Sequence, residues 1–148
     1  MGATVLALVA LLGGCGGGDD LSSDDRSYAD GTRDDAPRFI AARALRDAFT
    51  GVSTAAGGLD TCDDLGCRAD KGLALRQAAE AGVAQLTALD TRPLPECYVK
   101  AVDQATRALD AYRRAGIAFG RIHPDGTESA LTRAGRFEAG VTRSIAGC

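Results

Sequence analysis

The chain has 148 residues, a formal net charge of −3 and no tryptophan, and aromatic residues make up only 5% of it. This length accommodates one domain of ordinary size. Its core must be built from Ala, Leu, Val and a few Phe and Tyr, which argues against a β-sandwich and favours closely packed helices.

The first element is a short apolar run that ends at a cysteine. Residues 3–11 are almost all apolar, and Leu12-Gly13-Gly14-Cys15 follows them. This order of residues resembles the lipobox of bacterial lipoprotein precursors. The resemblance implies that residues 1–14 are a signal peptide and that Cys15 carries acyl chains such as palmitate. It also implies that the mature chain is lipid-anchored to the bacterial cell membrane on its extracytoplasmic side. A transmembrane helix needs about 20 apolar residues, roughly twice this run.

An acidic segment follows the cysteine. Residues 19–35 hold seven Asp against two Arg, a net charge of −5, so residues 36–148 carry the remaining +2. A segment rich in Gly, Ser and Asp buries too little apolar surface to fold, which predicts a disordered tether over residues 15–35, beginning at the lipidated cysteine. A calcium loop is the alternative, but its acidic ligands need a fixed spacing that this segment lacks.

Residues 36–148 are predicted to form four amphipathic helices, since apolar residues recur every three or four positions and no stretch alternates like a strand. The expected helices span 37–50, 68–89 and 95–120, and the last runs from a cap at Asp125 or Thr127 to residue 146. Gly51 and Gly57-Gly58 are expected to end the first helix, and residues 123–126 are expected to form a turn. The inward positions are Phe39, Ala42, Leu45, Phe49 and Val52; Leu75, Ala79, Gly82, Leu86 and Leu89; Tyr98, Val102, Ala105, Leu109, Tyr112, Gly116 and Phe119; and Leu131, Ala134, Phe137, Val141 and Ile145. Short connections make an all-α, up-down-up-down four-helix bundle the expected fold.

Four cysteines remain besides Cys15, namely Cys62, Cys67, Cys97 and Cys148. An even number in an exported domain indicates disulfides. Zinc is the alternative, but it requires closely paired cysteines or histidines, and the chain has one histidine. In the predicted bundle the start of the third helix and the end of the fourth lie at one end, which predicts Cys97–Cys148 and leaves Cys62–Cys67.

Catalytic patterns are weak. His123 is the only histidine, so a nucleophile activated by imidazole would have to be built on a residue expected in a surface turn. The Glu-x-x-His motif of di-metal bundles is missing, and the expected inward positions carry no carboxylate. We therefore expect no catalytic residue, no metal and no cofactor.

Basic residues form the most suggestive pattern. Lys100, Arg107, Arg114 and Arg121 recur every seven residues, and Arg136 and Arg143 repeat this spacing on the last helix. Such a face favours an anionic envelope polymer, lipid headgroups or an acidic protein as partner. The alternative is a solvated face on which Asp103 and Asp110 pair with the arginines four residues later. Nucleic acid is not expected outside the cytoplasm.

Tyr98 and Tyr112 lie on the inward side of the third helix. They are candidates for lining a ligand cavity, or alternatively they belong to the core with their hydroxyls at its rim. The sequence predicts a membrane-anchored extracytoplasmic lipoprotein whose non-catalytic helical module binds or modulates an envelope partner. Two alternatives stay open, namely a small-ligand carrier with an apolar cavity between helices and an enzyme with a composite carboxylate site.

Overall fold

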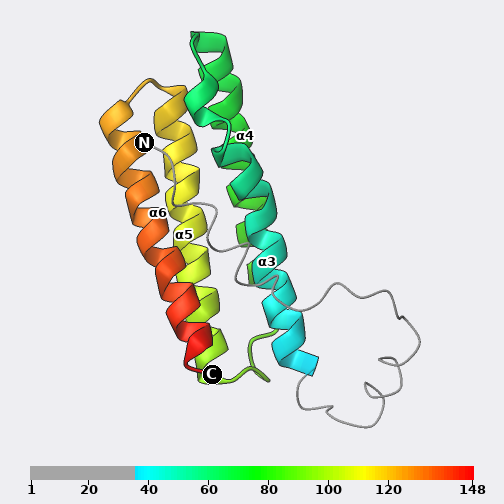
Figure 1. The fold of residues 1–148 in the computed structure, drawn as a ribbon. Coiled ribbons are helices and arrows are strands. Elements are labelled where there is room, and N and C mark those ends of the chain that lie inside the picture. The colour runs from blue at the N-terminus through cyan, green and yellow to red at the C-terminus, as the bar shows by residue number, and fades with distance from the viewer. Residues whose placement is uncertain (1–35) are drawn as a thin grey trace, which may run out of the picture.

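The computed structural model describes residues 36–148, and the predicted signal peptide, Cys15 and the acidic tether lie outside these residues. The described part of the chain contains four α-helices, a short 3₁₀ turn and no strand. The elements are α3 (Ala36–Ala56), η1 (Leu59–Thr61), α4 (Leu65–Thr87), α5 (Glu96–Gly120) and α6 (Pro124–Ala146). The helices run alternately up and down (Figure 1), which confirms the predicted bundle.

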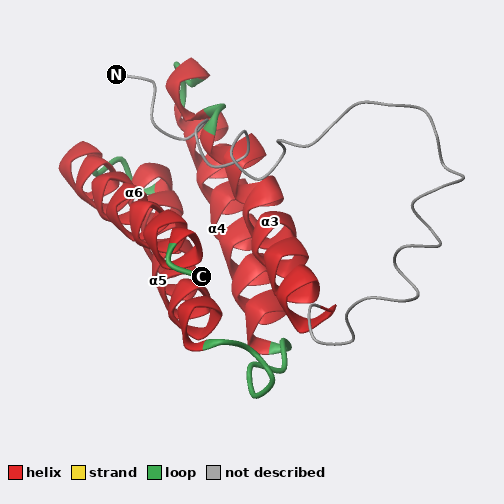
Figure 2. Ribbon diagram, turned by 60° about the horizontal axis from the view of Figure 1, so that its bottom comes forward, coloured by secondary structure: helices red, strands yellow, loops and turns green. Residues whose placement is uncertain are grey.

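The bundle is open on one side, and α5 is its central helix. Consecutive helices pack against each other, and α3 also touches α5 over a shorter stretch. α6 packs extensively on α5 alone and has no comparable contact with α3 or α4. α3 lies beside α4 and α6 lies beside α5 (Figure 2), and α4 and α5 pack on each other between these two edge helices. The side of α6 that faces away from α5 is therefore exposed.

The core consists mostly of small side chains, as predicted from the composition. The largest fully buried residues are Tyr112, Leu45, Leu75, Leu86, Leu109, Val52 and Val141. On α3 the expected inward stripe is wrong at its start, because Phe39 is 58% exposed, while Ala41 and Ala48 are buried. α5 also buries a second, unpredicted run of alanines, namely Ala101, Ala108, Ala111 and Ala115. A central helix needs two apolar sides, one for each neighbour.

Glycines allow the helix backbones to approach closely. A Cβ atom placed on Gly72 of α4 would lie 2.5 Å from the carbonyl oxygen of Gly116 on α5, and one placed on Gly116 would lie 2.5 Å from that of Gly72. At Gly82 a Cβ would lie 2.6 Å from the carbonyl oxygen of Ala48 on α3. These distances are too short for any side chain, so α4 is in backbone contact with both neighbours.

α3 extends further at its C-terminal end, and α4 at its N-terminal end, than the sequence predicts. α3 continues through Gly51 to Ala56, where a Cβ on Gly51 would lie 3.6 Å from the Ala78 side chain. Packing against α4 thus maintains the helix at a residue of low helix propensity. α4 begins at Leu65 because Asp64 is its N-cap, and the Asp64 carboxylate accepts a hydrogen bond from the Cys67 N–H at 2.8 Å.

The connection between α5 and α6 differs from the expected turn over residues 123–126. α5 ends in a Schellman motif, in which the N–H of His123 donates to the Ala118 carbonyl and that of Ile122 donates to the Phe119 carbonyl. Ile122 takes the left-handed φ of 59° that this motif requires. α6 then begins at once, because Pro124 in its first turn has no N–H that needs a partner. Neither Asp125 nor Thr127 is its cap.

Both predicted disulfides are confirmed. Cys62–Cys67 closes the loop before α4, with its Cα atoms 5.4 Å apart. Cys97–Cys148 joins the start of α5 to the chain just after α6, with its Cα atoms 5.7 Å apart. In the chain-entropy account the longer loop contributes about 4 kcal/mol to stability and the shorter about 2 kcal/mol.

The backbone contact between α4 and α5 predicts a large effect of one methyl group. Gly72→Ala is expected to lower the free energy of unfolding by about 1–3 kcal/mol, because the new Cβ has only backbone to displace. Gly135→Ala is the matched control, since nothing lies within 4 Å of its Cβ position, and it should raise stability by about 0.5–1 kcal/mol. Urea unfolding with the disulfides intact measures both, and equal effects would contradict the contact.

Candidate functional site

The predicted basic stripe on α5 is exposed, but most of its charge is paired. Lys100 Nζ lies 2.7 Å from Glu96 Oε1. Arg107 Nε lies 3.0 Å from Asp103 Oδ2. Arg114 Nη2 lies 2.8 Å from Asp110 Oδ2. Each of these three cations thus has a carboxylate one helical turn earlier. The solvated-face alternative expected the Asp103–Arg107 and Asp110–Arg114 pairs, and Glu96–Lys100 is a third.

The pKa values of two of these carboxylates, Glu96 and Asp110, are lowered by their ion pairs. The hydrogen bond and charge of Lys100 hold the pKa of Glu96 below its usual range. Partial burial of Asp110 acts to raise its pKa, but hydrogen bonds and charges from Arg113 and Arg114 outweigh it and leave the pKa lowered. Glu96 and Asp110 therefore stay ionised at neutral pH and offset the charges of Lys100 and Arg114.

The arginines of α6 are in a different situation. Arg133, Arg136 and Arg143 are exposed, and within residues 36–148 none has a carboxylate within ion-pairing distance. The same holds for Arg121, just after α5. The only acid among residues 129–146 is Glu138, which is buried. The outer face of α6, defined here by Arg133, Arg136 and Arg143, therefore presents three positive charges that form no ion pair within residues 36–148.

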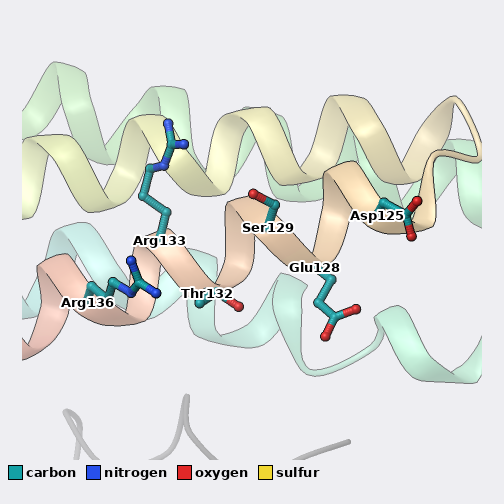
Figure 3. A pocket seen from close by; sticks show the side chains of 6 residues that line it. All are labelled: Asp125, Glu128, Ser129, Thr132, Arg133 and Arg136. Carbon is teal, nitrogen blue, oxygen red and sulfur yellow. The ribbon is translucent and has the colours of Figure 1, made fainter.

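Part of this face lies along a shallow, open depression on α6 (Figure 3). It is lined by Asp125, Glu128, Ser129, Thr132, Arg133 and Arg136. A second depression, on the seam between α5 and α6, is lined by Gln104, Gly140, Arg143 and Ser144. Neither is an apolar cavity, and neither is lined by Tyr98 or Tyr112. Both depressions instead extend the polar character of the outer face of α6.

Tyr112 belongs to the core, where it meets an acid that the sequence analysis missed. Its hydroxyl donates a hydrogen bond of 2.8 Å to Glu138 Oε1 on α6. Tyr112 is 1% exposed and Glu138 is 7% exposed. Glu138 lies four residues after Ala134 and three before Val141, both buried, so the helical period already placed it inward. Tyr98 is only half-buried.

Burial is the main cause of the raised pKa values of Tyr112 and Glu138. It raises the pKa of Glu138, and the hydrogen bond from Tyr112 offsets this only in part. The pKa of Tyr112 is raised as well, by burial first and then by the neighbouring carboxylate. The proton affinity of Glu138 therefore differs between the folded and unfolded chain, which couples folding to pH.

The remaining candidate residues among 36–148 do not form a metal site. His123 is exposed, and its carbonyl accepts hydrogen bonds from the N–H and the hydroxyl of Thr127. Within residues 36–148, no three His, Cys, Asp or Glu side chains gather as ligands for a metal ion. In the same part of the chain no helix combines the length and hydropathy needed to cross a membrane.

Comparison with known proteins gave no match, whether with protein-family models, curated proteins or solved structures. The feature that stands out is the outer face of α6.

The Tyr112–Glu138 hydrogen bond predicts opposite effects for two isosteric changes. A raised pKa means that the folded state holds the proton more tightly, so this stabilisation is present below about pH 4.5 and is lost as pH rises through the folded pKa. Glu138→Gln removes the titration and should make the protein more stable than wild type at neutral pH, but not at pH 4.5. Tyr112→Phe leaves a buried carboxylate without its donor and should cost about 1–3 kcal/mol at neutral pH.

Urea unfolding at both pH values measures these differences. Less destabilisation by Tyr112→Phe at the acidic pH is expected, because a protonated Glu138 is cheaper to bury. An unchanged pH dependence in Glu138→Gln would contradict the assignment.

Proposed function

We propose that this protein is a lipid-anchored extracytoplasmic helical module that docks an anionic component of the cell envelope and carries out no catalysis of its own. The observation that carries the proposal is the outer face of α6. Its three arginines are exposed and lack acidic partners among the described residues, whereas the cations of the α5 stripe are mostly paired. The proposed binding face is thus confined to α6, whereas the sequence pattern also included the basic residues of α5.

The dimensions of this face favour an extended partner. Arg133 and Arg143 are ten positions apart, which corresponds to about 15 Å along a helix. A row of that length complements repeated phosphate or carboxylate groups better than one small anion. Because α6 is an edge helix that packs on α5 alone, such a partner meets no steric obstacle from α3 or α4.

The anchoring part of the proposal rests on the lipobox and on the disulfides. Leu12-Gly13-Gly14-Cys15 has the order of a lipoprotein signal, and two disulfides in one small domain fit an oxidising compartment outside the cytoplasm. The carrier alternative has less support, since the Tyr112 hydroxyl is already bonded to Glu138 and is therefore not available to a ligand.

Anchoring predicts that Cys15 decides where the protein partitions. When cells are fractionated, the wild-type chain is expected in the membrane fraction and in the detergent phase of a phase separation. Cys15→Ser removes the thiol that receives the lipid, and acyl chains contribute about 0.8 kcal/mol per buried CH₂, so this variant should lose detergent-phase partitioning. Intact-mass measurement checks for the added acyl groups, and an unmodified wild-type Cys15 would contradict the anchor.

Docking predicts that the α6 arginines, and not the α5 cations, hold the partner. The native protein is purified in mild nonionic detergent, and every retained protein and polymer is identified by mass spectrometry and by phosphate and uronic-acid assays. The variant Arg133→Gln/Arg136→Gln/Arg143→Gln should lose at least about ten-fold of a retained anionic partner, since close charge pairs contribute a large part of such binding.

The matched control is Lys100→Gln/Arg107→Gln/Arg114→Gln, which removes the same charge from paired sites and should retain the partner. Equal loss in the two variants would mean that only net charge matters. No retained partner in the wild type would remove the support for docking.

A further inference from the structure

Two charge imbalances of the chain have opposite signs. Residues 19–35 carry a net charge of −5, and the outer face of α6 presents three arginines that lack acidic partners among the described residues. We infer that the acidic segment 19–35 docks on the outer face of α6 in the same molecule. Such docking makes the segment an internal competitor for any external anion.

The segment starts close enough to reach this face. Ala36 begins α3 at the end of the bundle where α6 finishes (Figure 1). α3 and α6 both pack on α5, so their axes are separated by at most two interhelical spacings, about 20 Å. Arg133 lies about 20 Å from the end of α6, and Arg143 only about 5 Å. The farthest of these arginines is thus within about 30 Å of Ala36.

The length of the segment matches this separation. For a random coil of seventeen residues the root-mean-square end-to-end distance is about 23 Å, and the fully extended length is about 56 Å. The effective concentration of a tethered ligand is highest when the tether's average length equals the distance to its site. Individually weak, screened ion pairs therefore suffice for docking.

Pairing within the fold directs the segment to α6. On α5, Lys100, Arg107 and Arg114 already hold carboxylates at 2.7–3.0 Å, which a new anion would have to displace. On α6 nothing has to be displaced. Asp125 and Glu128 lie in the first two turns of α6, at the end away from Ala36, and so repel the segment least where it arrives.

Paramagnetic relaxation provides the test. The full-length chain, in nonionic detergent micelles, carries Cys15→Ser and Ser23→Cys, so that position 23 has the only free thiol beside the two disulfides. A nitroxide on this thiol broadens the amide signals of nearby residues. At about 0.01 M salt, where the screening length is about 30 Å, we expect signals of residues 129–146 to weaken at least about two-fold.

The expected weakening disappears at about 1 M salt, where the screening length is about 3 Å. It also disappears in Arg133→Gln/Arg136→Gln/Arg143→Gln and persists in Lys100→Gln/Arg107→Gln/Arg114→Gln. The inference is overturned if the signals of α6 do not weaken, if both triple variants behave alike, or if weakening is confined to the first turn of α3.

These outcomes separate the inference from the proposed function. If the α6 signals weaken but no external partner is retained, the result supports docking of the segment and contradicts the proposed function. If the α6 arginines hold an external partner but the α6 signals do not weaken, the result supports the proposed function and contradicts docking of the segment. If both hold, replacing the seven Asp of the segment by Asn should increase partner retention, because the competitor has lost its charge.

Discussion

Backbone contact between α4 and its two neighbours is the constraint on which this fold depends. With so few large apolar residues, the protein cannot fill wide gaps between helices, so the helices must approach until their backbones touch. Gly72 and Gly116 permit this on one side of α4, and Gly82 permits it against Ala48 on the other. The buried alanines of α5, namely Ala101, Ala108, Ala111 and Ala115, are also small residues that permit close packing of this helix. Small residues lower the apolar area per residue, and two disulfides add stability that the core alone would lack.

The position of α6 follows from this arrangement. α6 packs on one helix only, yet it is held at both ends and in the middle: by the short Schellman connection from α5, by the Tyr112–Glu138 hydrogen bond and by the Cys97–Cys148 disulfide. These constraints keep an edge helix in place without burying its second side. That side is available for charges, and the arginines found there have no carboxylates to neutralise them within the described residues.

Much of the fold could be predicted from the sequence. Helical spacing gave the number and direction of the helices, and topology gave both disulfide pairings. One error arose where a tertiary contact outweighs local preference, at Gly51, which packing keeps inside α3. Another was the start of the α3 stripe, where Phe39 is exposed. At the candidate site the heptad spacing located the arginines but gave no information on their partners. Glu138 was missed because a carboxylate was not expected among inward positions, although its spacing placed it there.

The longer disulfide also determines how the protein would respond to mechanical load. If the chain is held at its N-terminus and the outer face of α6 is pulled by a bound partner, tension enters through α3 and α4 and reaches Cys97. From there the covalent bridge to Cys148 leads directly to the end of α6, so the load bypasses α5 and the hairpin cannot be extended beyond its closed loop. Under tension α3 and α4 can unravel and lengthen the connection. α5 and α6 remain in one covalently closed loop. The helices that unfold under such a load, α3 and α4, are therefore separate from the helix that carries the outer-face arginines.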